Sequence, residues 1–404
     1  MQTFEFIKKN LILMLAVAAG LFSIYFFGDK TLDNEWKVMV HNLEENNILS
    51  SREVNGVLVP NIFMPPLYPI FLFIIKKISF NSNIYLTTIL LIQLCFHLLS
   101  ANILKKILNL LFEEKFSNLG FLIFLFFPLS IYAVGQISSI NLQILLFIIF
   151  IYNFIKIFET NKKIFIVFFS TASGLLMLLR GEFFIFFIFS LIYLFLKKKD
   201  FSSILIALFV AILTISPYLV RNYQIFQTVT ITKSAGFNLL KGNNPLSRVE
   251  GIGMWYGYDV VPDLENKLKN LKPVIKYDLL ADKVFLYRAI EFIKENPSRY
   301  IKLYFKKIFS FLIIDPESTY PGYYSLFNVI PKLLLSITSL ISIAIFSRPK
   351  INLYNYFVLY YFLSAGLYSF FFILPRYSLS IMPVQIILTL FLIKKILSSY
   401  KFKL

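Results

Sequence analysis

Residues 11–27 read LILMLAVAAGLFSIYFF, and residues 28–69 continue GDKTLDNEWKVMVHNLEENNILSSREVNGVLVPNIFMPPLYP. The first stretch has no charged residue and acidic sequence follows it at once, which is typical of a membrane helix that ends in a surface loop. This loop carries a large share of the 22 acidic residues of the chain, namely Asp29, Asp33, Glu35, Glu44, Glu45 and Glu53. The order of these two stretches predicts polar groups held beside a membrane surface.

Composition extends this interpretation to the whole chain. The 404 residues are 58% hydrophobic and 15% charged, and 47 of them are Phe. A soluble domain does not need so much apolar surface, so we expect an integral membrane protein. Apolar runs of spanning length recur along the sequence, which favours helices over the short alternating strands of a barrel. The expected fold class is an all-α polytopic membrane protein.

Ten apolar segments are candidate spans, so we expect a bundle of about ten transmembrane helices. They cover residues 11–27, 84–104, 119–135, 140–158, 164–179, 183–196, 202–219, 328–346, 353–373 and 378–396. Several are shorter than the roughly 20 residues of a span, so their ends must extend into neighbouring sequence. The segment 302–314 is apolar but short and carries three lysines, which favours an amphipathic helix in the membrane interface. The alternative is that it spans the membrane, which would invert the sides of the basic loop at 348–350 and of the basic C-terminal tail.

Clusters of lysine and arginine between the spans set the expected orientation. They lie at residues 8–9, 105–106, 162–163, 197–199, 348–350 and 394–403. Because such clusters favour the cytoplasmic side, we expect both termini in the cytoplasm, at an inner or plasma membrane. Residues 28–83 then form a first outer loop and residues 220–327 a second outer region, both packed on a single membrane domain that covers residues 1–404.

The second outer region has its own expected local structure. Alternating β-branched residues at 228–232 predict a short strand, and Gly236 followed by the glycine, asparagines and proline of 242–245 predicts a turn-rich loop. Residues 278–295 place apolar side chains at helical spacing, which predicts a helix that lies on the membrane.

The charge and the rare residues argue against several functions. The chain has a net charge of +18, but its basic residues cluster between spans and its aromatic residues lie within them, so nucleic-acid binding is not expected. Cys95 is the only cysteine and His41 and His97 are the only histidines, which argues against a thiol or histidine metal site. Asp33 and Glu35 could hold a divalent ion through oxygen ligands, but two carboxylates in one loop do not predict an obligatory metal or another cofactor.

Arginines at three outer span ends are the strongest sign of a ligand. Arg180, Arg221 and Arg376 each lie at the end of a different span, on the side that the cytoplasmic bias disfavours. Since a guanidinium can pair bidentately with phosphate, we expect these arginines, together with Lys241, to bind a phosphorylated lipid. Candidates for further substrate contacts on the same side are Arg52, Tyr68, Asn222, Asn243 and Tyr377. The alternative is that the basic side chains snorkel to the lipid headgroups.

Asp33 and Glu35 are the candidate catalytic residues. A sugar carried on a lipid phosphate already has a good leaving group, so transfer needs one base for the acceptor and cations for the departing phosphate. This set of groups fits a single inverting displacement better than hydrolysis by a carboxylate pair. The alternative is that both carboxylates solvate the loop or cap a helix that starts near Asn34.

Short motifs along the chain occur in a recognisable order. They are LDNEWKVMVHNL (32–43), MPPLYPIFL (64–72), LLMLLRGEF (175–183), SPYLVRNYQIF (216–226), GFNLLKGNNP (236–245) and LPRYSLSIMP (374–383). As a set, from about residue 10 to 396, they resemble the lipid-linked sugar transferases of the GT-C class. The likeness is to the family that contains protein mannosyltransferases and the aminoarabinose transferases of lipid A.

The resemblance implies a polyprenyl-phosphate-linked sugar donor, an active site on the extracytoplasmic face and an inverting transfer to a lipid, glycan or protein acceptor. By position, Asp33 matches the catalytic aspartate of the family's first outer loop. The chain departs from the family in two motifs. The usual Asp-Glu pair reads Asp33-Asn34, with Glu35 shifted by one residue, and the usual Thr-Arg-Pro reads Leu179-Arg180-Gly181.

Two other functions stay open at this point. One is a transporter or flippase for a lipid-linked sugar, although the spans show neither an internal repeat nor mid-helix charges. The other is a polysaccharide polymerase or ligase that acts on lipid-linked sugars, which only the motif set disfavours.

Overall fold

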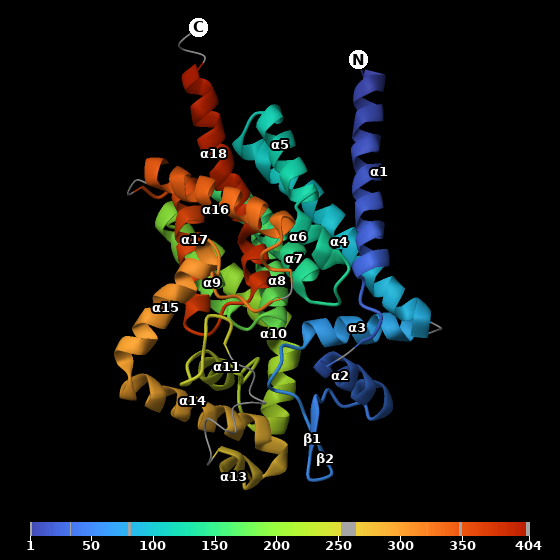
Figure 1. The fold of residues 1–404 in the computed structure, drawn as a ribbon, viewed down its shortest axis with the longest axis vertical. Coiled ribbons are helices and arrows are strands. Elements are labelled where there is room, and N and C mark those ends of the chain that lie inside the picture. Colours follow the sequence, from blue (N-terminus) through green and yellow to red (C-terminus); the bar gives the residue numbers. More distant parts are fainter. Residues whose placement is uncertain are drawn as a thin grey trace.

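The computed structural model describes residues 2–32, 34–79, 82–251, 264–320, 322–346 and 350–400, and helices dominate this part of the chain (Figure 1). The apolar helices are α1 (Gln2–Phe27), α4 (Ser82–Leu111), α5 (Glu114–Leu125), α6 (Pro128–Val134), α7 (Ile140–Glu159), α8 (Lys163–Leu179), α9 (Phe183–Lys198), α10 (Phe201–Phe226), α16 (Leu326–Phe346), α17 (Leu353–Ser369) and α18 (Met382–Tyr400), the last entered through the 3₁₀ helix η3 (Pro375–Ile381). The remaining elements are α2 (Asn34–Glu45), β1 (Arg52–Val54), β2 (Val57–Val59), α3 (Leu67–Ile78), α11 (Ala235–Gly242), α13 (Leu264–Lys269), η2 (Val274–Lys276), α14 (Tyr277–Glu295) and α15 (Pro297–Leu312). The expected all-α membrane fold class is confirmed.

The number of full-length spans is lower than the ten expected. Among the described residues, six helices are long and apolar enough to cross a membrane, or seven if α5 and α6, bent by 49°, form one span. Helices occupy the other three expected segments as well, but α8, α9 and α17 have only 17, 16 and 17 residues. At 1.5 Å per residue they are about 24–26 Å long, short of the roughly 30 Å of a hydrocarbon core.

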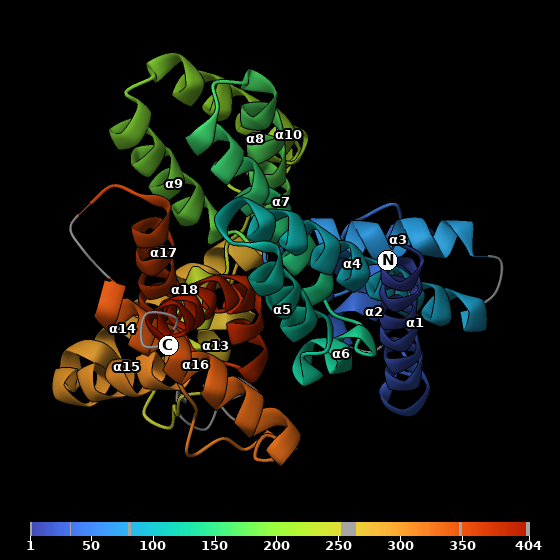
Figure 2. The same cartoon turned by 90° about the horizontal axis from the view of Figure 1, so that it is seen from above.

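Helix α7 forms the centre of the bundle. The span that it contributes is 78% buried, whereas those of α1 and α10 are each 17% buried. Helices α4 and α8 pack on α7, and α10 packs on the far side of α8. Stacked aromatic rings fill the interior, for example Phe154 on Tyr356 with centroids 4.0 Å apart. Figure 2 shows that α7 lies between the α8–α10 group and the α1–α4 group.

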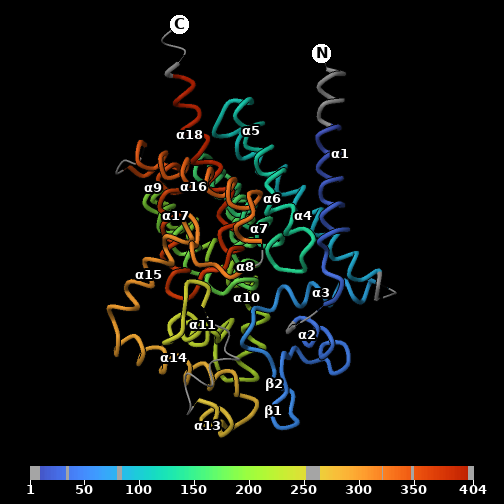
Figure 3. The backbone as a smooth tube through the Cα atoms, viewed as in Figure 1, coloured from blue at the N-terminus to red at the C-terminus, as the bar shows by residue number. Residues whose placement is uncertain are grey.

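The two outer regions meet at one end of the molecule. Figure 1 shows the N-terminal end of α1 and the C-terminal end of α18 at the opposite end from the β hairpin, α13 and α14. The backbone trace in Figure 3 follows the chain to this end twice, once after α1 and again after α10. The described parts of both regions thus lie at one end of the molecule, while their assignment to the outer side of a membrane stays a prediction.

The first outer loop is more regular than its sequence suggested. Strands β1 and β2 form an antiparallel hairpin that pairs Arg52 with Val59. Its turn residues Asn55 and Gly56 have φ of 52° and 77°, the left-handed conformation that Asn-Gly turns adopt between twisted strands. Helix α3 begins directly after Pro65 and Pro66 of the Pro-Pro-Leu-Tyr-Pro motif and includes Pro69 in its first turn.

Helix α14 confirms the helix predicted at 278–295, but the strand predicted at 228–232 is wrong. This segment has no strand partner. Its carbonyls instead bind the Asn222 side chain, whose amide donates to Thr230 O at 2.7 Å and to Ile231 O at 3.3 Å. The alternation of β-branched residues therefore marks an extended loop that a side chain holds in place.

Candidate functional site

Three cations from separate parts of the chain surround one pair of aromatic rings. The rings of Phe372 and Tyr377 lie 5.9 Å apart. Lys241 Nζ lies 4.5 Å from the Phe372 ring centre, and the guanidinium carbons of Arg180 and Arg376 lie 5.5 Å and 6.0 Å from that of Tyr377. We call these five residues the cation cluster. It brings together three of the four residues predicted to bind phosphate, as well as the predicted Tyr377.

Arg180 enters the cluster from the end of α8. Its backbone is extended (φ −149°, ψ 100°) and ends the helix, while its Nε donates to Gln143 Oε1 at 3.3 Å. Burial alone would lower the pKa of Arg180, but the nearby Glu182 carboxylate and Tyr377 outweigh that effect and raise the pKa, so the guanidinium stays charged. Glu182 is itself held by the Tyr368 hydroxyl, which donates to it at 3.3 Å.

Lys241 and η3 meet because the end of α11 packs against the segment that precedes η3. Asn243 Nδ2 donates to Phe370 O at 2.8 Å, and the Ile373 amide donates to Val249 O at 2.8 Å. Asn243, predicted to bind substrate, thus anchors backbone in this structure. Arg376 itself is exposed at the start of η3.

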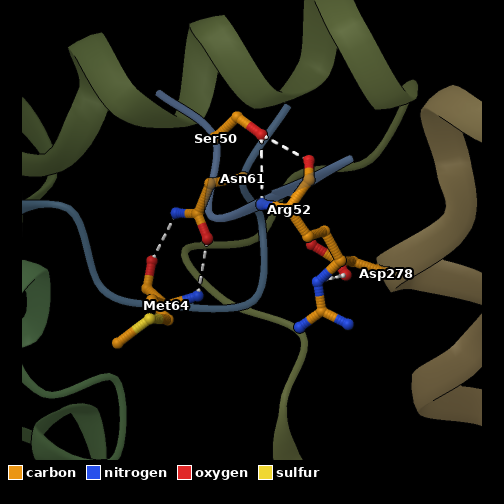
Figure 4. A network of polar contacts seen from close by, with 5 residues as sticks. All are labelled: Ser50, Arg52, Asn61, Met64 and Asp278. Atoms are coloured by element: carbon orange, nitrogen blue, oxygen red, sulfur yellow. Dashed lines mark hydrogen bonds and ion pairs between the residues drawn. The ribbon is translucent and has the colours of Figure 1, made fainter. Parts of the chain in front are cut away.

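Arg221 and Asn222 belong to a second network on α10. Arg221 donates to Asn61 O at 2.5 Å and to Asn222 Oδ1 at 2.7 Å. The side-chain amide of Asn61 in turn donates through Nδ2 to Met64 O and accepts through Oδ1 from the Met64 backbone N–H, which closes the loop after the hairpin (Figure 4). Arg221 therefore fastens the first outer loop to α10, and its contacts differ from those of the other three predicted phosphate ligands.

Arg52 pairs with a buried carboxylate of α14. Its Nε lies 3.3 Å from Asp278 Oδ1, and the Asp278 side chain is only 1% exposed (Figure 4). Burial raises the pKa of Asp278, although the Arg52 charge opposes this shift. The arginine also lies over Phe63, 5.1 Å from the ring centre. Arg52, which was predicted to contact substrate, thus links the hairpin to the second outer region through Asp278.

Replacing Arg52 with methionine is expected to lower the free energy of unfolding by about 1–3 kcal/mol, because the buried Asp278 would lose its cation. Thermal unfolding of the purified protein in detergent measures this effect. Arg52→Met combined with Asp278→Asn should recover most of the loss, since no buried charge would then remain. Equal losses in the single and double variants would contradict this account of Arg52.

Tyr68 connects α3, α2 and α4. It is 2% exposed, and its hydroxyl donates to Gln93 Oε1 at 3.2 Å. Its ring meets Trp36 of α2 edge to face, with centroids 5.2 Å apart. A hydrophobic cluster joins Trp36 and Met39 of α2 to Leu178 of α8 and Tyr218 of α10. Helix α2 therefore packs on the helix ends that carry Arg180 and Arg221.

Asp33, the principal catalytic candidate, lies outside the described residues, directly before α2, and the Glu35 side chain is not described either. The prediction of their roles therefore stays a prediction. In the part of the chain that is described, no three His, Cys, Asp or Glu side chains gather into a group that could hold a metal ion.

Sequence reasoning missed several residues beside the cluster. Glu182 follows Arg180 by two positions in the motif LLRGEF, which was a usable signal. Glu250 accepts from the Thr319 amide at 3.1 Å and from the Thr319 hydroxyl at 2.7 Å, and so holds the segment that leads to Tyr320. Lys307 donates to Gly242 O, next to Lys241 of the cluster, whereas the sequence only indicated that it is one of the lysines of an interfacial helix.

Comparison with protein-family models gives no match, and comparison with curated proteins gives none.

Proposed function

We propose that this chain is a membrane glycosyltransferase that transfers a sugar from a polyprenyl-phosphate-linked donor to an acceptor, with inversion at the anomeric carbon. The observation that carries the proposal is the convergence of Arg180, Lys241 and Arg376 on one aromatic pair. The Glu182 carboxylate beside Arg180 offsets part of this positive charge, and a lipid phosphate is the anion that a membrane protein meets at the end of its spans.

The chemistry follows from these groups. The Asp33 carboxylate takes the proton of the acceptor's nucleophilic hydroxyl or amine, whose freed electron pair forms the bond to the anomeric carbon. The bond from that carbon to the phosphate oxygen breaks, and the oxygen leaves with the bonding electrons. The cation cluster stabilises the charge of the departing phosphate. The packing of α2 against α8 and α10 supports this placement, because Asp33 directly precedes α2.

The proposal includes the architecture and the sidedness expected from the sequence. We propose a GT-C-like bundle in which α8, α9 and α17 enter the membrane beside the longer spans. The cluster then faces the extracytoplasmic side of an inner or plasma membrane, with both termini in the cytoplasm. The acceptor is a lipid, a glycan or a protein.

Replacing Arg376 with glutamine is expected to weaken the binding of polyprenyl phosphate, the released carrier, about tenfold, because a charge-assisted contact to the phosphate is lost. Binding of a synthetic polyprenyl phosphate to the purified protein in detergent micelles measures this effect. Arg376 is exposed, so the substitution should leave the unfolding temperature unchanged.

Arg288 is the matched control, because it lies on α14 and pairs with Glu291 at 2.7 Å. Arg288→Gln should bind polyprenyl phosphate as the unmodified protein does. An equal effect of both substitutions would indicate general surface electrostatics and would remove the cluster from the proposal.

A further inference from the structure

Lys307 differs from its neighbours on α15. Lys302 and Lys306 are exposed, and Lys306 pairs with Glu317 at 3.1 Å. Lys307 is 0% exposed and shares the buried face of the helix with Leu303 and Phe311. A lysine is rarely buried without a specific arrangement of acceptors, so the surroundings of its ammonium define its role.

The Lys307 ammonium binds three oxygens that come from two segments. It donates to Gly242 O at 2.8 Å, to Asn243 Oδ1 at 3.1 Å and to Phe371 O at 2.6 Å. An ammonium has three N–H donors, and a neutral amine has two. All three contacts can therefore form only while Lys307 is protonated.

These two segments carry opposite sides of the cation cluster. Lys241 directly precedes Gly242, and Phe372 directly follows Phe371. The Phe372 ring contacts both the Lys241 ammonium and the Tyr377 ring. A change in the spacing of the two carbonyls would therefore change the spacing between Lys241 and Tyr377.

We propose that Lys307 is a positioning residue for the candidate phosphate site, and that its ammonium fixes Lys241 relative to the segment that carries Phe372, Arg376 and Tyr377. This inference rests on the proposed function, because the site that it positions is the one assigned to the donor phosphate. Lys307 itself does not reach the phosphate, since its three donors are engaged with protein oxygens.

The charge of Lys307 changes near neutral pH. Burial lowers its pKa from 10.5 to about 7. The charged side chain that neighbours it on α11 is Lys241, and on α15 the adjacent Lys306 is paired with Glu317. Further elements that pack against α15 include η3, which carries Arg376 and Tyr377, and α17, whose Tyr368 ring stacks on Phe311. Loss of the proton removes one of the three hydrogen bonds, so the two segments are held less firmly above this pKa.

Loss of the Lys307 proton loosens the candidate site but increases the free energy of unfolding. Between about pH 7 and 10.5 the unfolded chain keeps a proton that the folded protein has lost, so this lysine makes the free energy of unfolding rise with pH. Stability and phosphate affinity should thus change in opposite directions over this window, which a residue with a merely structural role would not produce.

The test compares Lys307→Met, Lys307→Arg and the exposed control Lys302→Met with the unmodified protein. The probe is a synthetic polyprenyl phosphate in detergent micelles, with binding and unfolding temperature measured from about pH 6 to about pH 9. At the acid end Lys307→Met should bind about tenfold more weakly, and Lys302→Met should bind as the unmodified protein does. The ratio between unmodified and Lys307→Met affinities should shrink above about pH 7, and this ratio cancels the ionisation of the phosphate itself.

The outcomes separate this inference from the proposed function. If the unmodified protein binds the probe and Lys307→Met binds equally well, or if the ratio does not change with pH, the positioning role is wrong and the proposed function stands. If the unmodified protein does not bind the probe at any pH, both are wrong. Should Lys307→Met fail to fold, Lys307→Arg decides, because its permanent charge should make its affinity relative to that of the unmodified protein rise above about pH 7. A decline equal to that of the unmodified protein would overturn the inference.

Discussion

Replacing Asp33 with asparagine is expected to lower the rate of sugar transfer about 10²–10⁴-fold, the usual contribution of a general base. The amide keeps the size of the side chain but cannot accept a proton from the acceptor. The cation cluster does not include Asp33, so binding of polyprenyl phosphate should stay unchanged. The measurement is single-turnover transfer from a polyprenyl-phosphate-linked sugar in membranes that contain the variant, with lipid mass spectrometry to identify the donor that accumulates.

Glu53 provides the matched control for this substitution. It lies in the same outer loop and is exposed on β1. Glu53→Gln removes one carboxylate from the loop, as Asp33→Asn does, and should leave transfer unchanged. Full activity of Asp33→Asn would remove this residue from the mechanism. A loss shared by both variants would show that the acidity of the loop matters and that no single base acts.

The sequence indicated where the cations lie but not which of them meet. Arg180, Arg221 and Arg376 could all be assigned to span ends on one side, because hydropathy and charge bias depend only on local sequence. Which arginines share a ligand depends on helix packing over long separations. The structure joins Arg180 and Arg376 through Tyr377, while Arg221 binds Asn61 of the first outer loop.

The burial of Lys307 could have been predicted from the spacing of apolar residues on its helix, but not from the composition of that segment. The cluster of lysines near residue 306 suggested a polar face toward water. The spacing of Leu303, Lys307 and Phe311, four residues apart, instead places Lys307 on the apolar face of the helix. Its acceptors could not be predicted, because Gly242 and Phe371 are far from it in the chain.

The positions of the apolar helices could be predicted from the sequence, but their lengths could not. Helices formed in all ten expected segments, since apolar runs in lipid have to satisfy their own backbone hydrogen bonds. Their lengths depended on where helices end. The extended backbone of Arg180 stops α8 before Gly181, and Pro128 separates α5 from α6.

Replacing Gly242 with alanine is expected to lower the free energy of unfolding by about 3 kcal/mol, at the upper end of the cost of overpacking. A Cβ atom at this position would lie 1.8 Å from Phe371 O and 2.4 Å from the carbonyl carbon of the same residue. The glycine does not adopt a left-handed φ, so steric overlap is the whole cost. The carbonyl cannot move away cheaply, because it accepts the hydrogen bond from Lys307 Nζ at 2.6 Å. Thermal unfolding in detergent should therefore show a lower midpoint, and affinity for polyprenyl phosphate should fall with it.

Gly366→Ala on α17 is the matched control for this steric argument. There the nearest atom to an added Cβ is Tyr304 Oη at 3.5 Å, an ordinary van der Waals distance. Inside a helix such a substitution is neutral or stabilises by about 0.5–1 kcal/mol, because alanine has less conformational freedom to lose on folding. The two glycines thus predict shifts of opposite sign or very different size. Equal unfolding midpoints for both variants would mean that the end of α11 and the segment before η3 can separate without cost. The close packing of Gly242 against Phe371 would then not be what keeps Lys241 beside Phe372.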